Sequence, residues 1–169
     1  MQIELKNIFK TPDNENHFFG YFDVPQLSID NQFFLTQQIN DIYNYPSNKE
    51  KFNINLFDLK NNTRKIIGYT KCLNFQQGCR LQFLGPDFKN HIIYNDIIKN
   101  KYISRVINLI NGDIKTLNYP IASVSPKGDI FAHLDYERLY WYRKGYSYNN
   151  IINENKKKPI LENDSIKFI

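Results

Sequence analysis

The chain has 169 residues, of which 41% are hydrophobic and 15% aromatic, and its formal net charge is +5. This composition is typical of a globular protein with one core, so we expect a single domain, 1–169, and exclude a disordered chain. Three of the lysines are consecutive, at 156–158, and the tyrosines are scattered along the chain rather than gathered beside the cations, so we expect no nucleic-acid binding.

Strand signals dominate the sequence. Short runs rich in Ile, Phe, Tyr, Leu and Val alternate with Asn, Asp, Gly and Pro turns, which predicts an all-β fold. An N-terminal strand is expected at 1–9, followed by a polar loop and the stretch HFFGYFD at 17–23, which Pro25 ends.

Three blade-like units follow, at 24–70, 78–119 and 120–169. The first two contain four predicted strands each, at 27–29, 33–39, 52–59 and 63–69, and then at 80–84, 91–96, 102–109 and 113–118. The Asn111–Gly112 pair between two alternating runs is a strong hairpin signal. The third unit has strands at 121–125 and 130–135, an aromatic and charged stretch at 136–148, and a last strand at 164–169.

Meanders of four antiparallel strands that repeat along a chain are typical of β-propeller blades. We therefore predict a partial propeller of about two and a half blades. Closure needs at least about four blades, so the chain would be a fragment, a truncated product or one part of a closed assembly. The open blade edges of the incomplete chain could self-associate. The alternative is a β-sandwich.

Five segments resemble one known family. They are HFFGYFDVP at 17–25, LNFQQGCRLQFLG at 73–85, YND at 94–96, SRVINLINGD at 104–113 and RKGYSY at 143–148. Together they are similar to bacterial β-propeller proteins of poorly defined activity, whose genes commonly accompany glycosyltransferases in surface-polysaccharide clusters. The resemblance implies a truncated half of a longer propeller. Leu73 and Phe75 stand where that family has tryptophans. A more distant resemblance links the chain to propeller lyases that cleave oligogalacturonate with a metal held by histidines and glutamine.

The polar stretch 73–84 is the first candidate site. Its side chains offer uncharged donors and acceptors and one forked cation, which suit a polyhydroxylated or anionic ligand: Asn74, Gln76, Gln77, Arg80 and Gln82. Strand alternation would turn Arg80 and Gln82 toward the propeller channel, and Leu81 and Phe83 away from it. The alternative role for these residues is hydrogen bonding between blades.

Other polar residues could join this site. His17 and Asp23 would converge with the glutamines if their motif lines the channel, or would belong to a structural hydrogen-bond network. Arg105 adds a cation that could meet a carboxylate or phosphate. His133 and Asp135 would share one face of a strand and could bind a cation, or form a structural pair.

Further aromatic and cationic side chains could either stack on sugars or cap the rim of the propeller: Arg138, Tyr140, Trp141, Arg143, Tyr146 and Tyr148. Cys72 and Cys79 lack the spacing of a zinc or redox motif and are expected to be free thiols.

The sequence thus predicts a carbohydrate-binding or scaffold protein of bacterial surface-polysaccharide metabolism, with a glycan ligand and no cofactor. The alternative is a metal-assisted lyase or hydrolase of acidic sugars, in which Arg80 would neutralise a carboxylate and His17 or His133 would hold a divalent metal. A decayed gene product that only self-associates is a third hypothesis. No apolar run reaches the ~18 residues of a membrane span, and the N-terminal segment lacks the apolar part of a signal peptide, so we expect a cytoplasmic protein.

Overall fold

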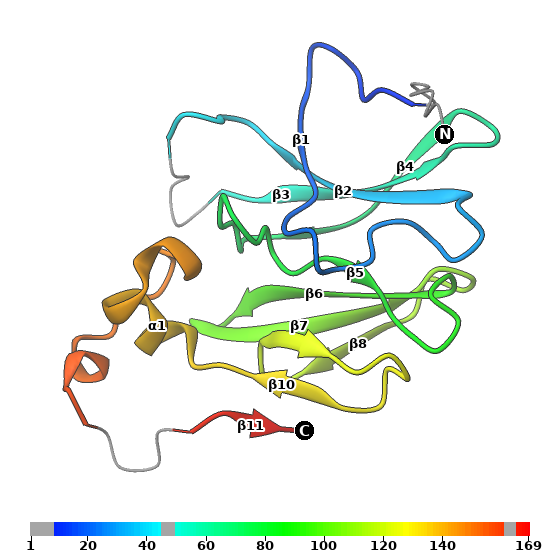
Figure 1. Cartoon of the computed structure of the whole chain (residues 1–169). Helices are drawn as coiled ribbons and strands as arrows, with labels where there is room; N and C mark the ends of the chain where they lie inside the picture. Colours follow the sequence, from blue (N-terminus) through cyan, green and yellow to red (C-terminus); the bar gives the residue numbers. More distant parts are fainter. Residues whose placement is uncertain (1–8, 45–49, 161–164) are drawn as a thin grey trace, which may run out of the picture.

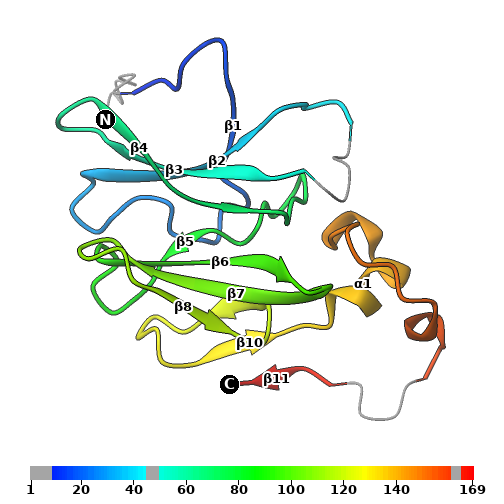
Figure 2. The same cartoon turned by 180° about the vertical axis from the view of Figure 1, so that it is seen from behind.

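The computed structural model describes residues 9–44, 50–160 and 165–169. Within these ranges the protein is all-β, with three antiparallel sheets and little helix. The sheets lie one above another, and the helical segment lies beside one end of them (Figures 1 and 2). Most of the predicted strand at 1–9 and the first residue of that at 164–169 fall outside the described residues. None of the described helices is long and apolar enough to cross a membrane.

The first sheet has the order β1-β2-β3-β4. Its strands are β1 (Asn16–Phe18), β2 (Phe33–Ile39), β3 (Phe52–Asp58) and β4 (Thr63–Thr70). We predicted the innermost strand at 27–29, but this segment makes only a bridge from Leu27 to Phe34. The edge of β2 is instead shared, because β1 pairs with its C-terminal half while Gln26 and Ser28 bond to its start.

The second sheet repeats this plan as β5-β6-β7-β8. Its strands are β5 (Gln82–Phe83), β6 (His91–Ile98), β7 (Lys101–Asn108) and β8 (Ile114–Leu117). The predicted strand at 80–84 is shorter than expected because Gly78 and Arg80 have left-handed backbone angles, with φ of 57° and 58°. Those angles keep the chain out of extended geometry until Gln82.

The third sheet contains β9 (Ile121–Val124), β10 (Phe131–His133) and β11 (Lys167–Phe168) in the order β11-β10-β9. Between β10 and β11 the chain forms α1 (Tyr136–Tyr142) and two 3-10 turns, at Lys144–Tyr146 and Glu154–Lys157. The sequence analysis did not predict this helix. Its signal is local: the Asp135 side chain caps the helix by accepting from the backbone N–H of Arg138.

The first two sheets repeat a detailed turn as well as a strand order. Asp58 ends β3 and Asn108 ends β7, and the side-chain oxygen of each accepts two backbone N–H groups of the following turn. The next residues, Leu59 and Leu109, each donate their backbone N–H to the residue just before the second strand of their sheet. Equivalent positions in the two sheets therefore play the same role.

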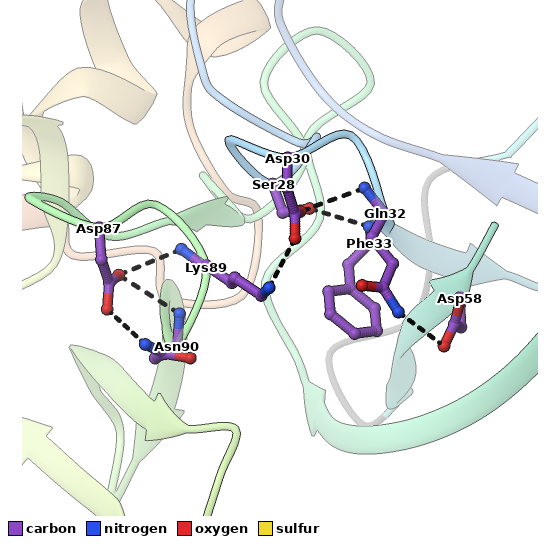
Figure 3. A network of polar contacts seen from close by, with 8 residues as sticks. All are labelled: Ser28, Asp30, Gln32, Phe33, Asp58, Asp87, Lys89 and Asn90. Atoms are coloured by element: carbon purple, nitrogen blue, oxygen red, sulfur yellow. Dashed lines mark hydrogen bonds and ion pairs between the residues drawn. The ribbon is translucent and has the colours of Figure 1, made fainter. Parts of the chain in front are cut away.

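One apolar core joins the first two sheets. Leu35 and Ile54 of the first sheet pack with Phe83 and Ile92 of the second. At the turns, the Lys89 ammonium lies 2.5 Å from the Asp30 carboxylate and bridges the sheets (Figure 3). Hydrogen bonds from Lys89 and from the Ser28 hydroxyl hold the pKa of Asp30 well below its usual value.

Asn95 of β6 is a fully buried polar centre that touches all three sheets. Its carboxamide nitrogen donates to the Ile121 carbonyl at 2.8 Å and to the Tyr148 hydroxyl at 2.9 Å. Its carboxamide oxygen accepts from the backbone N–H of Ile121 at 2.7 Å and from the Ser104 hydroxyl at 2.9 Å. The backbone carbonyl of Asn95 also accepts from the Thr70 hydroxyl at 2.6 Å. This residue therefore fixes β9 against β6 and the end of β4.

Replacing Asn95 by Ala should lower the free energy of unfolding by about 2–4 kcal/mol, because buried groups of Ile121, Ser104 and Tyr148 each lose a hydrogen bond. Urea unfolding followed by the fluorescence of the single tryptophan, Trp141, measures this loss. Asn118→Ala, at an exposed position between β8 and β9, is the matched control and should change the stability by less than about 0.5 kcal/mol. Equal losses in the two variants would contradict the role of Asn95.

Candidate ligand-binding site

The polar stretch that follows β4 folds around two buried carboxamides. The oxygen of Asn74 accepts the backbone N–H groups of the next turn, and its nitrogen donates to the carbonyls of Gly145 at 2.9 Å and Ser147 at 2.8 Å. Gln37 of β2 donates to the Cys72 carbonyl at 2.8 Å and accepts from the Cys79 backbone N–H at 3.2 Å. These contacts fix the loop and the position at which Arg80 leaves it.

Arg80 and Gln82 line a cavity of about 330 Å³ to which all three parts of the structure contribute. The segment between β1 and β2, the start of the second sheet, and the end of β9 with the turn after it meet there. The described lining residues are Asp23, Val24, Pro25, Arg80, Gln82, Phe83, Gly85, Phe88, Ser123, Val124, Ser125 and Pro126. We expected Leu81 and Phe83 to face away from the side of the strand that carries Arg80. Phe83 instead lines the same cavity as Arg80, while Leu81 is buried and does not line it.

Arg80 is a buried cation with few partners. Its side chain is 6% exposed, and its two terminal nitrogens lie 3.3 and 3.4 Å from the carboxylate oxygens of Asp23. These distances exceed the ~2.7–2.9 Å of a strong charge-assisted hydrogen bond. The Nε–H group is buried, and none of the described residues accepts a hydrogen bond from it. Because a buried charge is costly unless its donors are satisfied, this guanidinium is suited to bind a further anionic or polar group.

Two glycines let the second and third sheets meet beside the cavity. A Cβ on Gly85 would overlap the backbone carbonyl of Pro126, and a Cβ on Gly128 would overlap that of Gly85. On the other side, the backbone N–H of Phe83 donates to the Pro25 carbonyl at 2.8 Å. The walls of the cavity are therefore held by backbone contacts, which favours a preformed site.

The other predicted ligand-binding residues do not line this cavity and have structural contacts elsewhere. The buried ring of His17 contacts the Thr36 hydroxyl and the Glu15 carboxylate, each at 2.8 Å, on the opposite face of the first sheet from the core. Gln76 is exposed, and Gln77 donates to the Tyr146 carbonyl at 3.1 Å. Arg105 pairs with Asp96 at 2.6 Å. The structure thus brings together Asp23, Arg80 and Gln82 from the predicted set.

His133 and Asp135, two of the three metal candidates, line a smaller cavity of about 230 Å³. His133 Nδ1 lies 3.0 Å from the Pro120 carbonyl, which can only accept, so this nitrogen carries the proton. Asp135 caps α1 and pairs with Lys156 at 2.5 Å. Among the described residues, no group of three or more His, Cys, Asp or Glu side chains is placed to hold a metal ion.

The aromatic and cationic residues of α1 hold the chain that follows the helix. Arg138 donates to the carbonyls of Lys156, Lys158 and Pro159, and Trp141 donates to that of Asn153. Tyr148 stacks on Tyr136 at 4.6 Å inside the core. Burial raises the pKa of Tyr136 to about 12. These contacts support a structural role for the aromatic and cationic residues rather than stacking on sugars.

Both cysteines are free and fully buried. Burial raises the pKa of the Cys72 and Cys79 thiols well above the usual value, so neither forms a thiolate at neutral pH. Neither cysteine has the properties of a catalytic nucleophile.

Ser123 and Ser125 line the cavity but were not among the predicted site residues. A repeated turn could have found the second of them. The hydroxyls of Ser28 and Ser125 each donate to a nearby aspartate and accept a backbone N–H five residues further along the chain. Aligning these two turns would have singled out Ser125 as the counterpart of Ser28 in the third unit.

No family model and no curated protein matches the sequence. Among solved structures, the apo form of the AtxE2 isopeptidase is similar, with a TM-score of 0.51 and 12% sequence identity. The alignment covers 91% of this chain and 28% of that chain, so this chain spans little more than a quarter of that structure. At this identity the likeness shows the fold alone.

The close contact between the β5–β6 hairpin at Gly85 and the β9–β10 hairpin at Gly128 can be tested by two glycine substitutions. Gly128 and Gly112 both have left-handed φ angles, of 72° and 80°, but only Gly128 has atoms close to the added Cβ. Gly112→Ala should cost about 1–2 kcal/mol from backbone strain. Gly128→Ala should cost about 2 kcal/mol more because the hairpins must move apart. Thermal unfolding compares them, and equal losses would show that the close approach does not matter.

Proposed function

We propose that this protein is a carbohydrate-binding or scaffold protein of bacterial surface-polysaccharide metabolism, acting in the cytoplasm, and that its cavity binds an acidic glycan through Arg80. The observation that carries the proposal is the buried, poorly paired guanidinium beside a cavity of about 330 Å³. Arginine binds carboxylates with two parallel hydrogen bonds, so an acidic sugar would satisfy it.

The rest of the cavity supports a sugar ligand. Gln82, Ser123 and Ser125 carry neutral polar groups of the kind that hydrogen-bond to hydroxyls, while Phe83 and Phe88 add apolar surface. A cavity of this size, lined by both apolar side chains and a few polar groups, is typical of a small-molecule site. It has room for one sugar residue of a longer glycan.

The fold enters the proposal as an incomplete β-propeller, with each sheet as one blade. Support comes from the repeated strand order and from the repeated turns at Asp58 and Asn108. The segment between β1 and β2 lines one cavity together with β5 and β9, the first strands of the second and third sheets in chain order, as the inner strands of blades around a channel would. Three stacked sheets also favour this arrangement over the two facing sheets of a sandwich. Self-association through open blade edges stays a prediction.

The alternative, a metal-assisted lyase or hydrolase of acidic sugars, needs a metal ligand near Arg80. Neither His17 nor His133 lines the cavity that contains Arg80. The contacts of both histidines are described above and are those of structural residues. The geometry therefore favours binding over this chemistry.

Arg80→Lys tests the proposal because it keeps the positive charge and removes the guanidinium fork. Titration calorimetry with a galacturonate oligosaccharide should show binding to the wild-type chain and a loss of about tenfold or more in the variant. Arg64→Lys alters an arginine that pairs with Glu15 away from the cavity and is the matched control.

The same oligosaccharide with its carboxylates reduced to alcohols should bind the wild-type chain weakly. The proposal would be wrong if the wild-type chain bound neither sugar, or if Arg80→Lys and Arg64→Lys bound the acidic sugar equally well. Circular dichroism melting of each variant identifies any loss that is due to unfolding.

A further inference from the structure

We infer that the cavity is one half of a site for at least two sugar residues. The carboxylate of one residue replaces Asp23 on Arg80, and the ring of its neighbour stacks on Tyr21 and Phe22. This inference rests on the proposed function and names the class of glycan: an acidic sugar joined to a second ring that offers an apolar face.

Tyr21 and Phe22 form an exposed aromatic pair directly before Asp23. Their ring centres lie 4.7 Å apart, and their residues are 37% and 85% exposed. Neither belongs to the apolar clusters of the core. The next residue in the chain, Asp23, lines the cavity. Adjacent exposed aromatic residues are suited to a ligand that has both apolar and polar faces, as a sugar ring has.

The loop that carries this pair is anchored next to the polar stretch. Gly20 has a φ of 86°, and a Cβ there would lie 2.7 Å from the backbone carbonyl oxygen of Gln77. Phe19, one residue earlier, packs against Phe34 of β2 with ring centres 6.1 Å apart. The loop is therefore held at its start, and its aromatic tip lies close in the chain to the cavity.

Asp23 has the properties of an internal substitute for a ligand carboxylate. It faces the guanidinium with both oxygens, yet at 3.3 and 3.4 Å, and its side chain is 47% exposed. A half-exposed carboxylate at these distances is a weak partner. An incoming carboxylate could take its place at little cost, and the apparent affinity would be reduced by the fraction of time that Asp23 occupies the arginine.

The test compares galacturonic acid with a galacturonate trisaccharide, each titrated into the full chain. Phe22→Ala should weaken trisaccharide binding about five- to tenfold and leave the monosaccharide affinity unchanged, because only the neighbouring ring is lost. Tyr43→Ala removes an aromatic residue that is 87% exposed and does not line the cavity, and it is the matched control. Asp23→Asn should raise the affinity for both ligands roughly threefold or more, because it removes the competing carboxylate.

The outcomes separate this inference from the proposed function. If the wild-type chain binds neither ligand, the proposed function is wrong and the inference fails with it. If binding depends on Arg80 but Phe22→Ala behaves like Tyr43→Ala, or weakens both ligands equally, the cavity binds a glycan without the aromatic pair. A loss of affinity in Asp23→Asn, at unchanged melting temperature, would show instead that Asp23 contacts the ligand directly.

Discussion

The structure depends on the hydrogen bonds of one buried carboxamide, that of Asn95. Its nitrogen and oxygen bind the carbonyl and the N–H of Ile121, much as a neighbouring strand would, and so join the second sheet to the third. The same residue reaches Ser104 in its own sheet and Tyr148 after the helix. Each of these groups is buried, so no water replaces a lost bond, and the arrangement is held in one register.

The cavity follows from that constraint. Once β9 is fixed against β6, the hairpin at Gly128 meets the one at Gly85 with backbone against backbone. The segment between β1 and β2 is tied to β5 by the hydrogen bond from Phe83 to the Pro25 carbonyl, and the turns are tied by Lys89 and Asp30 (Figure 3). Arg80 is thereby held in a rigid wall. A buried cation in a preformed cavity needs little rearrangement to bind an anion, which is the physical basis of the proposed site.

Much of the fold could be predicted from the sequence because strand signals are local. The runs that became β2, β3, β6 and β7 are rich in Ile, Phe, Leu and Tyr and are followed by turns that contain Asn or Asp. The inner edge of the first sheet was harder, since two separated segments share it. A left-handed φ at Arg80 could not be predicted, because few residues other than Gly and Asn adopt it. The site was predicted in part: Asp23, Arg80 and Gln82 meet, while Ser123 and Ser125 come from a unit that only tertiary packing brings near.

The central claim is that the segment between β1 and β2, the start of the second sheet and the end of β9 form one anion-binding cavity around Arg80. The most direct measurement is a backbone amide NMR titration of the full chain with a galacturonate oligosaccharide. The account predicts saturable shifts concentrated at 23–25, 80–88 and 123–126, with little change around His17 or His133. Shifts at Tyr21 and Phe22 would accompany these if the neighbouring sugar ring stacks there. Shifts confined to those histidines or to the helix, or no saturable shift at all, would contradict the account.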